Sequence, residues 1–186
     1  MRIAMHQPNF VPWMPFFSKI ASVDLFVIVY NCQTNRVGYQ NRFKYDDRWY
    51  TMSIEHGNLH GSIAETNYAF PTRDWERIKR CLPQFKEFFN ALDGCIGRSM
   101  CETNMAIIRI LLEKLKIATP IVYDEPGMLL STERLLALCQ KHGCTHYVSG
   151  PSGKNYLDVS RFEAAGIPVE FIDNSQLDRR HVFELL

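Results

Sequence analysis

The sequence predicts an α/β fold in three layers, a mostly parallel sheet with helices on both faces, plus a small β-hairpin insertion. Three observations support this. Strand and helix patterns alternate at the start of the chain and again over its last third, residues 25–30 are apolar almost throughout, and β-rich segments flank the polar turn at 45–48. A near-continuous apolar strand is typical of a parallel sheet covered on both faces, and alternating strands and helices build such sheets.

The first strand is expected at residues 2–5, followed directly by a helix. Trp13, Phe16, Phe17 and Ile20 have the spacing that places side chains on one helical face. The strand at 25–30 comes next, so the chain begins with a compact strand–helix–strand unit.

The middle of the chain changes character at Gly38. Residues 38–54 resemble a hairpin, and residues 57–70 are polar and irregular, which indicates a loop and a plausible lid within a β-rich insertion at 38–70. Helices are expected at 72–82 and 84–92, separated by Pro83. The second of these helices has an apolar stripe made of Phe85, Phe88, Phe89 and Leu92.

A longer helix is predicted after Ser99, which forms a capping-box pattern with Glu102. The last third then alternates between predicted strands and helices. The strands are 120–123, 145–149 and 169–172, and the helices are 132–141 and 155–165, stopped by Gly143 and Gly166. The tail at 175–186 has no clear strand and is expected to be a terminal helix or disordered.

Composition limits the classes of protein that this chain can belong to. Its 186 residues suit one domain, and 46% hydrophobic with 22% charged residues is ordinary for a soluble globular protein. No apolar run approaches the roughly 18 residues of a membrane span. The N-terminus lacks the pattern of a secretory signal, so we expect a cytoplasmic protein. Six dispersed cysteines are expected to be reduced and mostly buried.

The charge balance argues against nucleic acid as a partner. A net charge of +1 gives no global positive field, so an anion has to be met locally. Arg36, Arg42, Lys44 and Arg48 form a basic stretch that is opposed only by two aspartates at the turn. This stretch is either an anion-binding patch or a solvated hairpin face.

The first candidate site follows the first strand. His6, Gln7 and Asn9 lie where a strand hands over to a helix, and Pro8 restricts the backbone between them. Ligands of open α/β sheets bind at the carboxyl ends of strands. The imidazole can act as a general base, a donor to a developing oxyanion or a phosphate ligand. A structural histidine is the alternative.

The second candidate site follows the strand at 145–149. Small residues allow close approach of a ligand to the backbone, the next predicted helix offers its N-terminus, and Lys154 can neutralise phosphate or carboxylate. A flexible turn is the alternative. The segment is not a Walker motif, because Gly150 and Gly153 are too close together and Asn155 replaces the magnesium-binding Ser or Thr.

No metal site or nucleophile motif is predicted. Cys139, His142, Cys144 and His146 would converge on zinc only with contrived geometry, so we expect no metal. His56 and His60 are separated by Gly57 and Asn58 and would contact substrate from a lid or be merely exposed. No Gly-x-Ser-x-Gly elbow is present, and no motif identifies a cofactor.

The opening His6-Gln7-Pro8-Asn9-Phe10-Val11-Pro12-Trp13 resembles the signature of the WbqC-like family of bacterial proteins, as do Gln40-Asn41-Arg42 and the segment 147–158. The resemblance implies an association with O-antigen or other surface-polysaccharide or modified-sugar biosynthesis, and an enzymatic role as a transferase of a small acyl or aminoacyl group. Tyr30-Asn31-Cys32-Gln33 departs from the family's acidic Asp-Asp-x-Gln pattern by losing both carboxylates. The tail also lacks the expected Tyr-x-Gln region.

The favoured hypothesis is a transferase acting on a sugar nucleotide or another small anionic sugar-type substrate. The alternatives are a nucleotidyltransferase-like enzyme, for which a second histidine is missing, and a non-catalytic small-molecule binding module, which exposed-looking aromatics at Trp49 and Tyr50 favour. A homodimer is compatible with the sequence. The expected catalytic residues are His6, Gln7 and Asn9, and the expected substrate-binding residues are Trp13, Gln33, Gln40, Asn41, Arg42, Ser149, Gly150, Ser152, Gly153, Lys154 and Tyr156.

Overall fold

The computed structural model describes the chain except for residues 36, 56–60, 128–130, 174, 176 and 179. The chain divides into two compact units, each built from segments that are far apart in sequence. Unit 1 comprises Met1–His6, Met14–Val29 and Ile117–Arg179, and unit 2 comprises Gln7–Trp13, Tyr30–Lys116 and Arg180–Leu186. The expectation that the chain forms a single domain stays a prediction.

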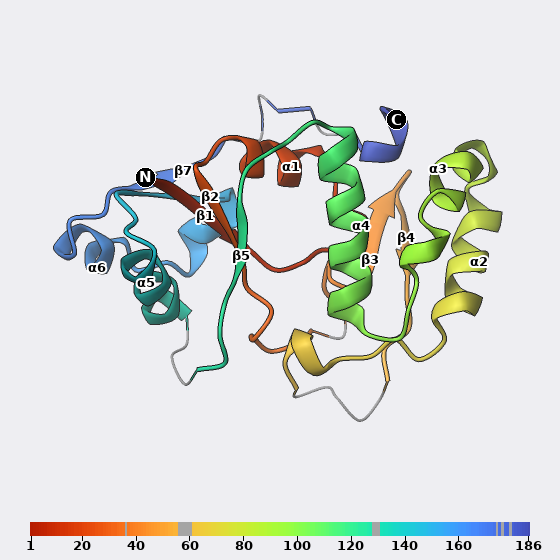
Figure 1. Ribbon diagram of the computed structural model, residues 1–186, viewed down its shortest axis with the longest axis horizontal. Coiled ribbons are helices and arrows are strands. Elements are labelled where there is room, and N and C mark those ends of the chain that lie inside the picture. The colour runs from red at the N-terminus through yellow and green to blue at the C-terminus, as the bar shows by residue number, and fades with distance from the viewer. Residues whose placement is uncertain (36, 56–60, 128–130, 174, 176, 179) are drawn as a thin grey trace. The chain divides into compact units, whose positions relative to one another are not determined.

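Unit 1 contains a five-stranded parallel sheet with the strand order β5-β2-β1-β6-β7 (Figure 1). Its strands are β1 (Arg2–His6), β2 (Leu25–Ile28), β5 (Ile121–Tyr123), β6 (His146–Ser149) and β7 (Val169–Phe171). β1 lies in the middle, so that Ala4 pairs with Phe26 of β2 on one side and with Val148 of β6 on the other. The predicted α/β class with a parallel sheet is therefore confirmed.

Three helices accompany this sheet, namely α1 (Met14–Ala21), α5 (Ser131–Lys141) and α6 (Val159–Ala164). The chain passes from β1 through α1 to β2 in one direction along the sheet, and from β6 through α6 to β7 in the other. Because such crossovers are right-handed, α1 and α6 cover opposite faces. α5 packs against α6, and the covered strands bury Ile3, Phe26, Val27 and Val148 completely.

α1 begins one residue later than the spacing predicts. Phe16, Phe17 and Ile20 are buried on its inner face as expected. Trp13 precedes the helix and instead forms an antiparallel bridge with His181 in unit 2, so its predicted place on the helical face is wrong. The bridge engages the backbone of Trp13 in β-type pairing, so the helix begins only at Met14.

The helix predicted at 155–165 is also wrong over its first half. A 3₁₀ turn at Pro151–Asn155 follows β6, and α6 begins only at Val159. The N–H groups of Tyr156 and Leu157 bond to the carbonyl oxygen of Gly153 at 3.2 and 2.9 Å, which closes the turn on itself. The helix stop at Gly166 is confirmed by its φ of 72°.

Unit 2 combines a hairpin with three helices. These elements are β3 (Arg42–Tyr45), β4 (Arg48–Thr51), α2 (Pro71–Cys81), α3 (Lys86–Asn90) and α4 (Met100–Lys114). Tyr45 pairs with Arg48, and Asp46 and Asp47 have φ values of 47° and 57°, as a type I′ turn requires. The predicted hairpin and its turn are therefore confirmed.

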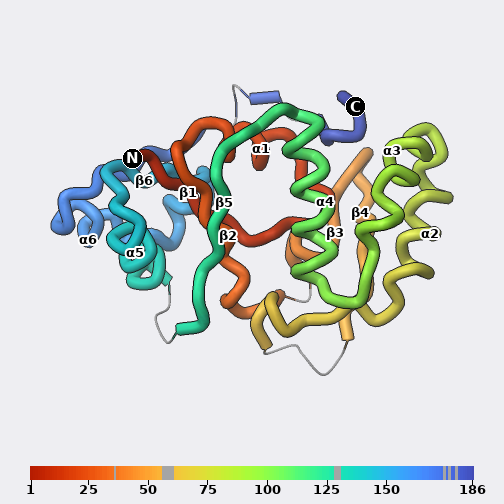
Figure 2. Tube along the Cα trace, viewed as in Figure 1, coloured from red at the N-terminus to blue at the C-terminus, as the bar shows by residue number. Residues whose placement is uncertain are grey.

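α4 is the longest helix among the described residues (Figure 2). Ser99 caps it, because its Oγ accepts a hydrogen bond from the Glu102 N–H at 3.2 Å. Met105, Ile108 and Leu112 are buried along one face. The predicted helix and its cap at Ser99 are therefore confirmed.

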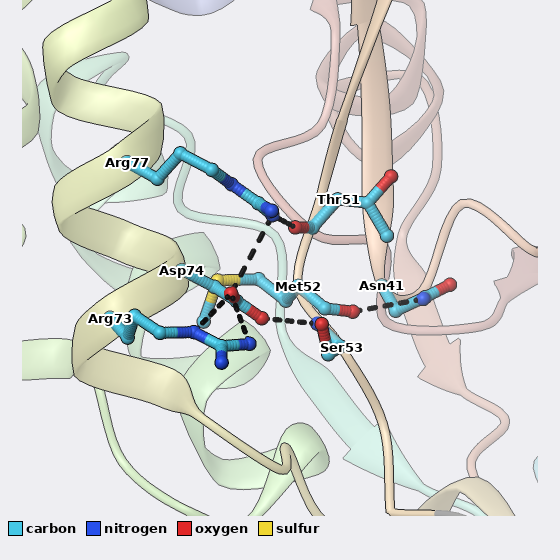
Figure 3. Close-up of polar contacts among 7 residues, drawn as sticks. All are labelled: Asn41, Thr51, Met52, Ser53, Arg73, Asp74 and Arg77. Carbon is cyan, nitrogen blue, oxygen red and sulfur yellow. Dashed lines mark hydrogen bonds and ion pairs between the residues drawn. The ribbon is translucent and has the colours of Figure 1, made fainter.

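The carboxylate of Asp74 ties α2 to the chain that follows β4 (Figure 3). Its Oδ2 accepts a hydrogen bond from the Ser53 N–H at 2.7 Å, and Arg73 and Arg77 reach its Oδ1 at 3.2 and 3.6 Å. Arg77 also donates to the Thr51 carbonyl oxygen at 2.7 Å. The hairpin is thereby fixed to its neighbouring helix.

Aromatic rings make up much of the core of unit 2. Phe43 stacks on Tyr50 at 5.2 Å, and Phe89 packs edge-on against Trp75 at 5.4 Å. Tyr50 is only 9% exposed, so its predicted exposure is wrong. Phe43 and Tyr50 are directly paired across the hairpin, and that pairing turns both side chains inward.

The C-terminal tail belongs to this core. A 3₁₀ turn at Val182–Glu184 places Phe183 against Phe85 at 4.7 Å and Phe89 at 5.5 Å. Phe183 is 3% exposed. Over 182–184 the tail is therefore a short 3₁₀ turn held by aromatic packing, in place of the expected helix or disorder.

Other expectations have mixed outcomes. All six cysteines are free thiols, but only Cys139 and Cys144 are buried, so the expectation of mostly buried thiols is wrong. Of the predicted lid, residues 57–60 lie outside the described residues, and Ile63 and Tyr68 are buried. No helix among the described residues is both long enough and apolar enough to span a membrane.

Candidate active site

The strand order of unit 1 reverses between β1 and β6. From β1 the chain proceeds to β2 and β5 on one side of the sheet, and β6 and β7 then extend the sheet on the other side of β1. Crevices at such reversal points, outside the carboxyl ends of the strands, are where open α/β sheets bind ligands. His6 is the last residue of β1 and Ser149 is the last residue of β6. Both predicted turns of unit 1 therefore begin at this switch point.

The His6 ring is positioned by aromatic packing. It lies edge-on against Phe16 of α1, with ring centroids 5.3 Å apart and an interplanar angle of 89°. Its carbonyl oxygen accepts a hydrogen bond from the Val29 N–H at 2.9 Å, which extends the pairing with β2. A half-buried imidazole held in this way keeps one orientation at the end of a strand.

The turn after β6 is tightly packed at Gly153. A Cβ at that position would lie 2.0 Å from Ser149 Oγ and 3.2 Å from Phe171 Cε1. Ser149 is buried and donates its hydroxyl to the Gly150 carbonyl oxygen at 3.2 Å. The Gly153 N–H bonds to the same carbonyl oxygen at 3.0 Å. The turn is therefore an ordered feature.

Lys154 extends from this turn into solvent. Its Nζ lies 5.6 Å from the centroid of the Phe171 ring. No described carboxylate forms an ion pair with it. Ser152 and Tyr156 are also exposed, and Gly150 is half-buried. A cation without a protein counter-ion, beside exposed polar groups, is suited to an anionic ligand.

Lys19 is a candidate that the sequence reasoning missed. Its Nζ donates a hydrogen bond to the Met5 carbonyl oxygen at 3.1 Å, immediately before His6, and lies 5.7 Å from the Phe26 ring centroid. The residue is 5% exposed, and burial lowers the pKa of its amine to about 7. The signal was available, because Lys19 follows Phe16 by three residues and so shares the buried face of α1.

The predicted amides belong to unit 2, where several form a buried network. Gln7 Nε2 donates to Cys32 Sγ at 2.9 Å, and Gln40 Nε2 donates to Gln7 Oε1. Asn104 Nδ2 bridges the carbonyl oxygens of Pro8 and Gln40 at 2.8 and 2.7 Å. Asn104 was not predicted, because nothing in the spacing of a helical asparagine indicates a partner so distant in sequence.

Asn9 Oδ1 and Gln40 Oε1 have no hydrogen-bond donor among the described residues, and both side chains are more than nine-tenths buried. Buried polar atoms are normally paired with protein, water or ligand. Asn41 has a structural role. Its side-chain Nδ2 donates to the Met52 carbonyl oxygen at 3.0 Å, and its backbone carbonyl oxygen accepts from the Met52 N–H at 2.8 Å.

Comparison with known proteins decides the family. A family model described as the WbqC-like protein family matches residues 7–181, nearly the whole chain. The chain belongs to the WbqC-like protein family. Among curated proteins, it is 30% identical to the uncharacterized protein Rv1507c of Mycobacterium tuberculosis (strain ATCC 25618 / H37Rv), over 92% of this chain and 82% of that protein. No solved structure was found to match it.

The segment Tyr30-Asn31-Cys32-Gln33, where a departure from the family is expected from the sequence, lies in unit 2 of this WbqC-like protein. The carbonyl oxygens of Tyr30 and Cys32 accept hydrogen bonds from the N–H groups of Ala64 and Ile63, each at 3.0 Å. Gln33 forms a bridge with Ser62. The segment is therefore part of the folded unit even though it lacks the two carboxylates.

The predicted site residues fall into two groups in this WbqC-like protein. Unit 1 holds His6, Ser149, Gly150, Ser152, Gly153, Lys154 and Tyr156, and unit 2 holds Gln7, Asn9, Trp13, Gln33, Gln40, Asn41 and Arg42. Within unit 1, the sheet order brings the His6 end of β1 next to the turn after β6. A single site combining both groups stays a prediction. His56 and His60 lie outside the described residues.

Proposed function

We propose that this WbqC-like protein is a transferase of surface-polysaccharide or modified-sugar biosynthesis. It moves a small acyl or aminoacyl group to a nucleotide-linked or otherwise anionic sugar-type substrate. The observation that carries the proposal is the pair of functional turns, at His6 and at Ser149–Lys154, that flank the switch point of the parallel sheet. Such crevices bind nucleotides and other anionic ligands in many open α/β sheets.

The chemistry assigned to unit 1 needs a base and a counter-charge. In the proposed transfer, a hydroxyl or amine of the sugar attacks the carbonyl carbon of the donor, its proton passes to the His6 imidazole, and the donor's leaving group departs. Lys154 holds the negative group of the substrate, and Tyr156 lines the crevice. Positioning of the two reactants supplies most of the rate enhancement when no covalent intermediate is formed.

Amides of unit 2 have a separate role in this proposal. Gln7, Asn9 and Gln33 recognise polar groups of a ligand within unit 2, and Arg42 recognises negative charge there. The buried acceptor atom of Asn9, for which no described residue provides a donor, supports such a role. Amide side chains can both donate and accept, and so they suit the hydroxyl groups of sugars.

The decisive experiment compares two histidine variants. His6→Ala should reduce turnover of sugar-nucleotide acceptors with acyl or aminoacyl donors by about 10²-fold or more, because general-base catalysis contributes about that much. The matched control is His146→Ala, because His146 begins β6 and pairs with Arg2 at the opposite, amino-terminal edge of the sheet. Equal turnover by both variants would remove His6 from the mechanism.

Nucleotidyl transfer is the second candidate. It is favoured by the same strand order, because a histidine-bearing turn after β1 and a Ser/Gly/Lys turn after β6 follow neighbouring strands at one switch point. Incubation with labelled ATP or CTP separates the two functions, because only nucleotidyl transfer releases pyrophosphate. Saturable ligand binding with no product in either assay would instead indicate a binding module.

A further inference from the structure

The two faces of the β3–β4 hairpin differ in chemistry. Phe43 and Tyr50 point into the core of unit 2, where Phe43 also meets Phe10 at 5.9 Å. Alternation along the strands sends Arg42, Lys44 and Trp49 to the other face, and Lys44 pairs directly with Trp49. One side of the hairpin is thus a hydrophobic contact and the other an outer face rich in cations and aromatic surface.

Two aromatic rings lie side by side on this outer face. Trp49 and Tyr39 are 42% and 57% exposed, and their ring centroids are 5.6 Å apart. Single exposed aromatic residues are common on protein surfaces and need no explanation. The two rings are inclined to each other by 54°, so a flat ring of a ligand can stack on one of them while its edge meets the other.

Cations accompany the rings. The Arg42 guanidinium lies 3.9 Å from the centroid of the Trp49 ring, and Arg42 forms no ion pair among the described residues. Its Nε–H is buried and lacks an acceptor there. Lys44 pairs with Asp47 at 2.7 Å, but both side chains are well exposed, and such surface pairs exchange at little cost. Both cations are therefore available to an incoming anion.

The outer face of the hairpin is held in place by hydrogen bonds to its neighbouring backbone. The Phe10 N–H donates to the Tyr39 carbonyl oxygen at 2.8 Å. The Asn41 side-chain amide donates to the Met52 carbonyl oxygen (Figure 3), and the Asn41 backbone carbonyl accepts from the Met52 N–H. Gly38 packs closely against Gln40, because a Cβ there would lie 2.0 Å from Gln40 Oε1. A preorganised surface loses little conformational freedom on binding, which favours a binding role over an incidental arrangement.

We propose that the outer face of the hairpin, formed by Tyr39, Arg42, Lys44 and Trp49, binds a ligand in which a flat-faced ring carries a negative group. The ring packs against Trp49 and Tyr39, and Arg42 and Lys44 meet the charge. All four residues belong to unit 2, and the choice of an anionic sugar-type ligand rests on the proposed function. The ring comes either from the nucleobase of a sugar nucleotide or from an acidic pyranose.

The test follows the indole N–H resonance of Trp49 by NMR during titration with UDP-glucuronic acid. The chain has three tryptophans, and the Trp49→Phe spectrum assigns the signal. The resonance should shift saturably. Trp49→Ala and Tyr39→Ala should each weaken binding about tenfold, measured by calorimetry, because aromatic stacking on a ring contributes about that much. Arg42→Gln should weaken it similarly, whereas Trp49→Phe, which keeps a ring, should retain most of the affinity.

Phe70→Ala is the matched control. Phe70 is also exposed and also carries an arginine, because the Arg73 guanidinium lies 3.8 Å from its ring centroid, but no second ring adjoins it among the described residues. This variant should bind like the wild type. Titrations with UDP alone, glucuronic acid alone and neutral glucose distinguish nucleobase from acidic pyranose, and glucose should not bind.

Two results would overturn the proposal. One is a Trp49 resonance that stays unchanged at saturating UDP-glucuronic acid, and the other is wild-type affinity in both Trp49→Ala and Tyr39→Ala. Should Trp49→Ala fail to fold, Tyr39→Ala and Arg42→Gln still test the same surface, because Tyr39 precedes the strand and is largely exposed. Binding at Trp49 without turnover would contradict the proposed transferase activity but not the proposed binding surface. Turnover without binding at Trp49 would contradict only the proposed binding surface.

Discussion

The buried amine of Lys19 donates a hydrogen bond to the carbonyl oxygen of Met5 at 3.1 Å, one residue before the histidine that ends the central strand. No described carboxylate forms an ion pair with Lys19. Burial therefore penalises its charged form and lowers its pKa to about 7. This single contact links the interior of unit 1 to the carboxyl end of β1.

The first prediction concerns the pH dependence of stability. In the unfolded chain Lys19 keeps its proton up to about pH 10, so between pH 7 and pH 10 the unfolded state binds more protons than the folded one. The free energy of unfolding of the wild type should therefore rise with pH relative to Lys19→Met, by at most about 1.4 kcal/mol per pH unit. Urea denaturation of both proteins at about pH 6.5 and about pH 9.5 checks this. The prediction would be contradicted if the difference in the free energy of unfolding between wild type and Lys19→Met were the same at both pH values.

The second prediction concerns the turn after β6. Gly153→Ala should destabilise the protein by about 1–3 kcal/mol, because its Cβ would collide with Ser149 Oγ. Gly150→Ala serves as the control, since nothing lies within 4 Å of a Cβ there. Adding Ser149→Ala to Gly153→Ala should restore part of the lost free energy of unfolding. A double-mutant cycle, measured by urea denaturation, gives the interaction energy between the two positions. Strict additivity would show that the two residues do not meet.

The third prediction concerns Asp74 (Figure 3). Burial raises the pKa of this carboxyl, but hydrogen bonds from Ser53 and Arg73 and the charge of Arg77 outweigh it and leave the pKa lowered. Asp74→Asn should lower the free energy of unfolding by about 1–3 kcal/mol at neutral pH. Because a lowered folded pKa gives stability that is lost on acidification, the gap between wild type and variant should narrow below about pH 4. Thermal or urea unfolding at both pH values tests this, and an unchanged gap would contradict it.

The fourth prediction concerns the C-terminal tail. Phe183→Ala removes a buried ring that contacts Phe85 and Phe89, so it should lower the free energy of unfolding by about 3–5 kcal/mol. Leu186→Ala, at a half-exposed position three residues later, should change stability by less than about 0.5 kcal/mol. Comparable stability of the two variants would mean that the tail does not support unit 2.

Much of the fold could be predicted because local signals agreed with the final structure. The cap at Ser99 and the stop at Gly143 mark real helix ends, and the apolar run after Asp24 is a strand buried on both faces. The helix expected from 155 fails because the backbone leaves the helical region at Tyr156 (φ −138°) and is extended at Asp158 (φ −80°, ψ 93°), and no local pattern in the sequence marks this break. Tyr50 was misassigned because it was grouped with Trp49, although consecutive residues of a strand point to opposite faces.

The candidate site was predictable only in part. His6 and Lys154 could be assigned to strand ends, but that β1 and β6 are neighbours depends on a sheet order that no local pattern encodes. Lys19 was not considered as a candidate, although its spacing from Phe16 places it on the buried face of α1. The amide network around Asn104 joins residues far apart in sequence, and a single sequence carries no signal for such pairs.

The central claim is that His6 and Lys154 serve one ligand at the switch point of the sheet. The most direct test follows the His6 ring resonances by NMR during titration with UDP-glucuronic acid, in the wild type, in Lys154→Ala and in the control Lys141→Ala, which changes an exposed lysine of α5. We predict that the His6 resonances shift saturably in all three proteins. The ligand concentration at the midpoint should be about tenfold higher or more in Lys154→Ala than in the wild type and in Lys141→Ala, because a charge-assisted contact is lost. A His6 signal that does not move at saturation, or the same midpoint in all three proteins, would contradict the account.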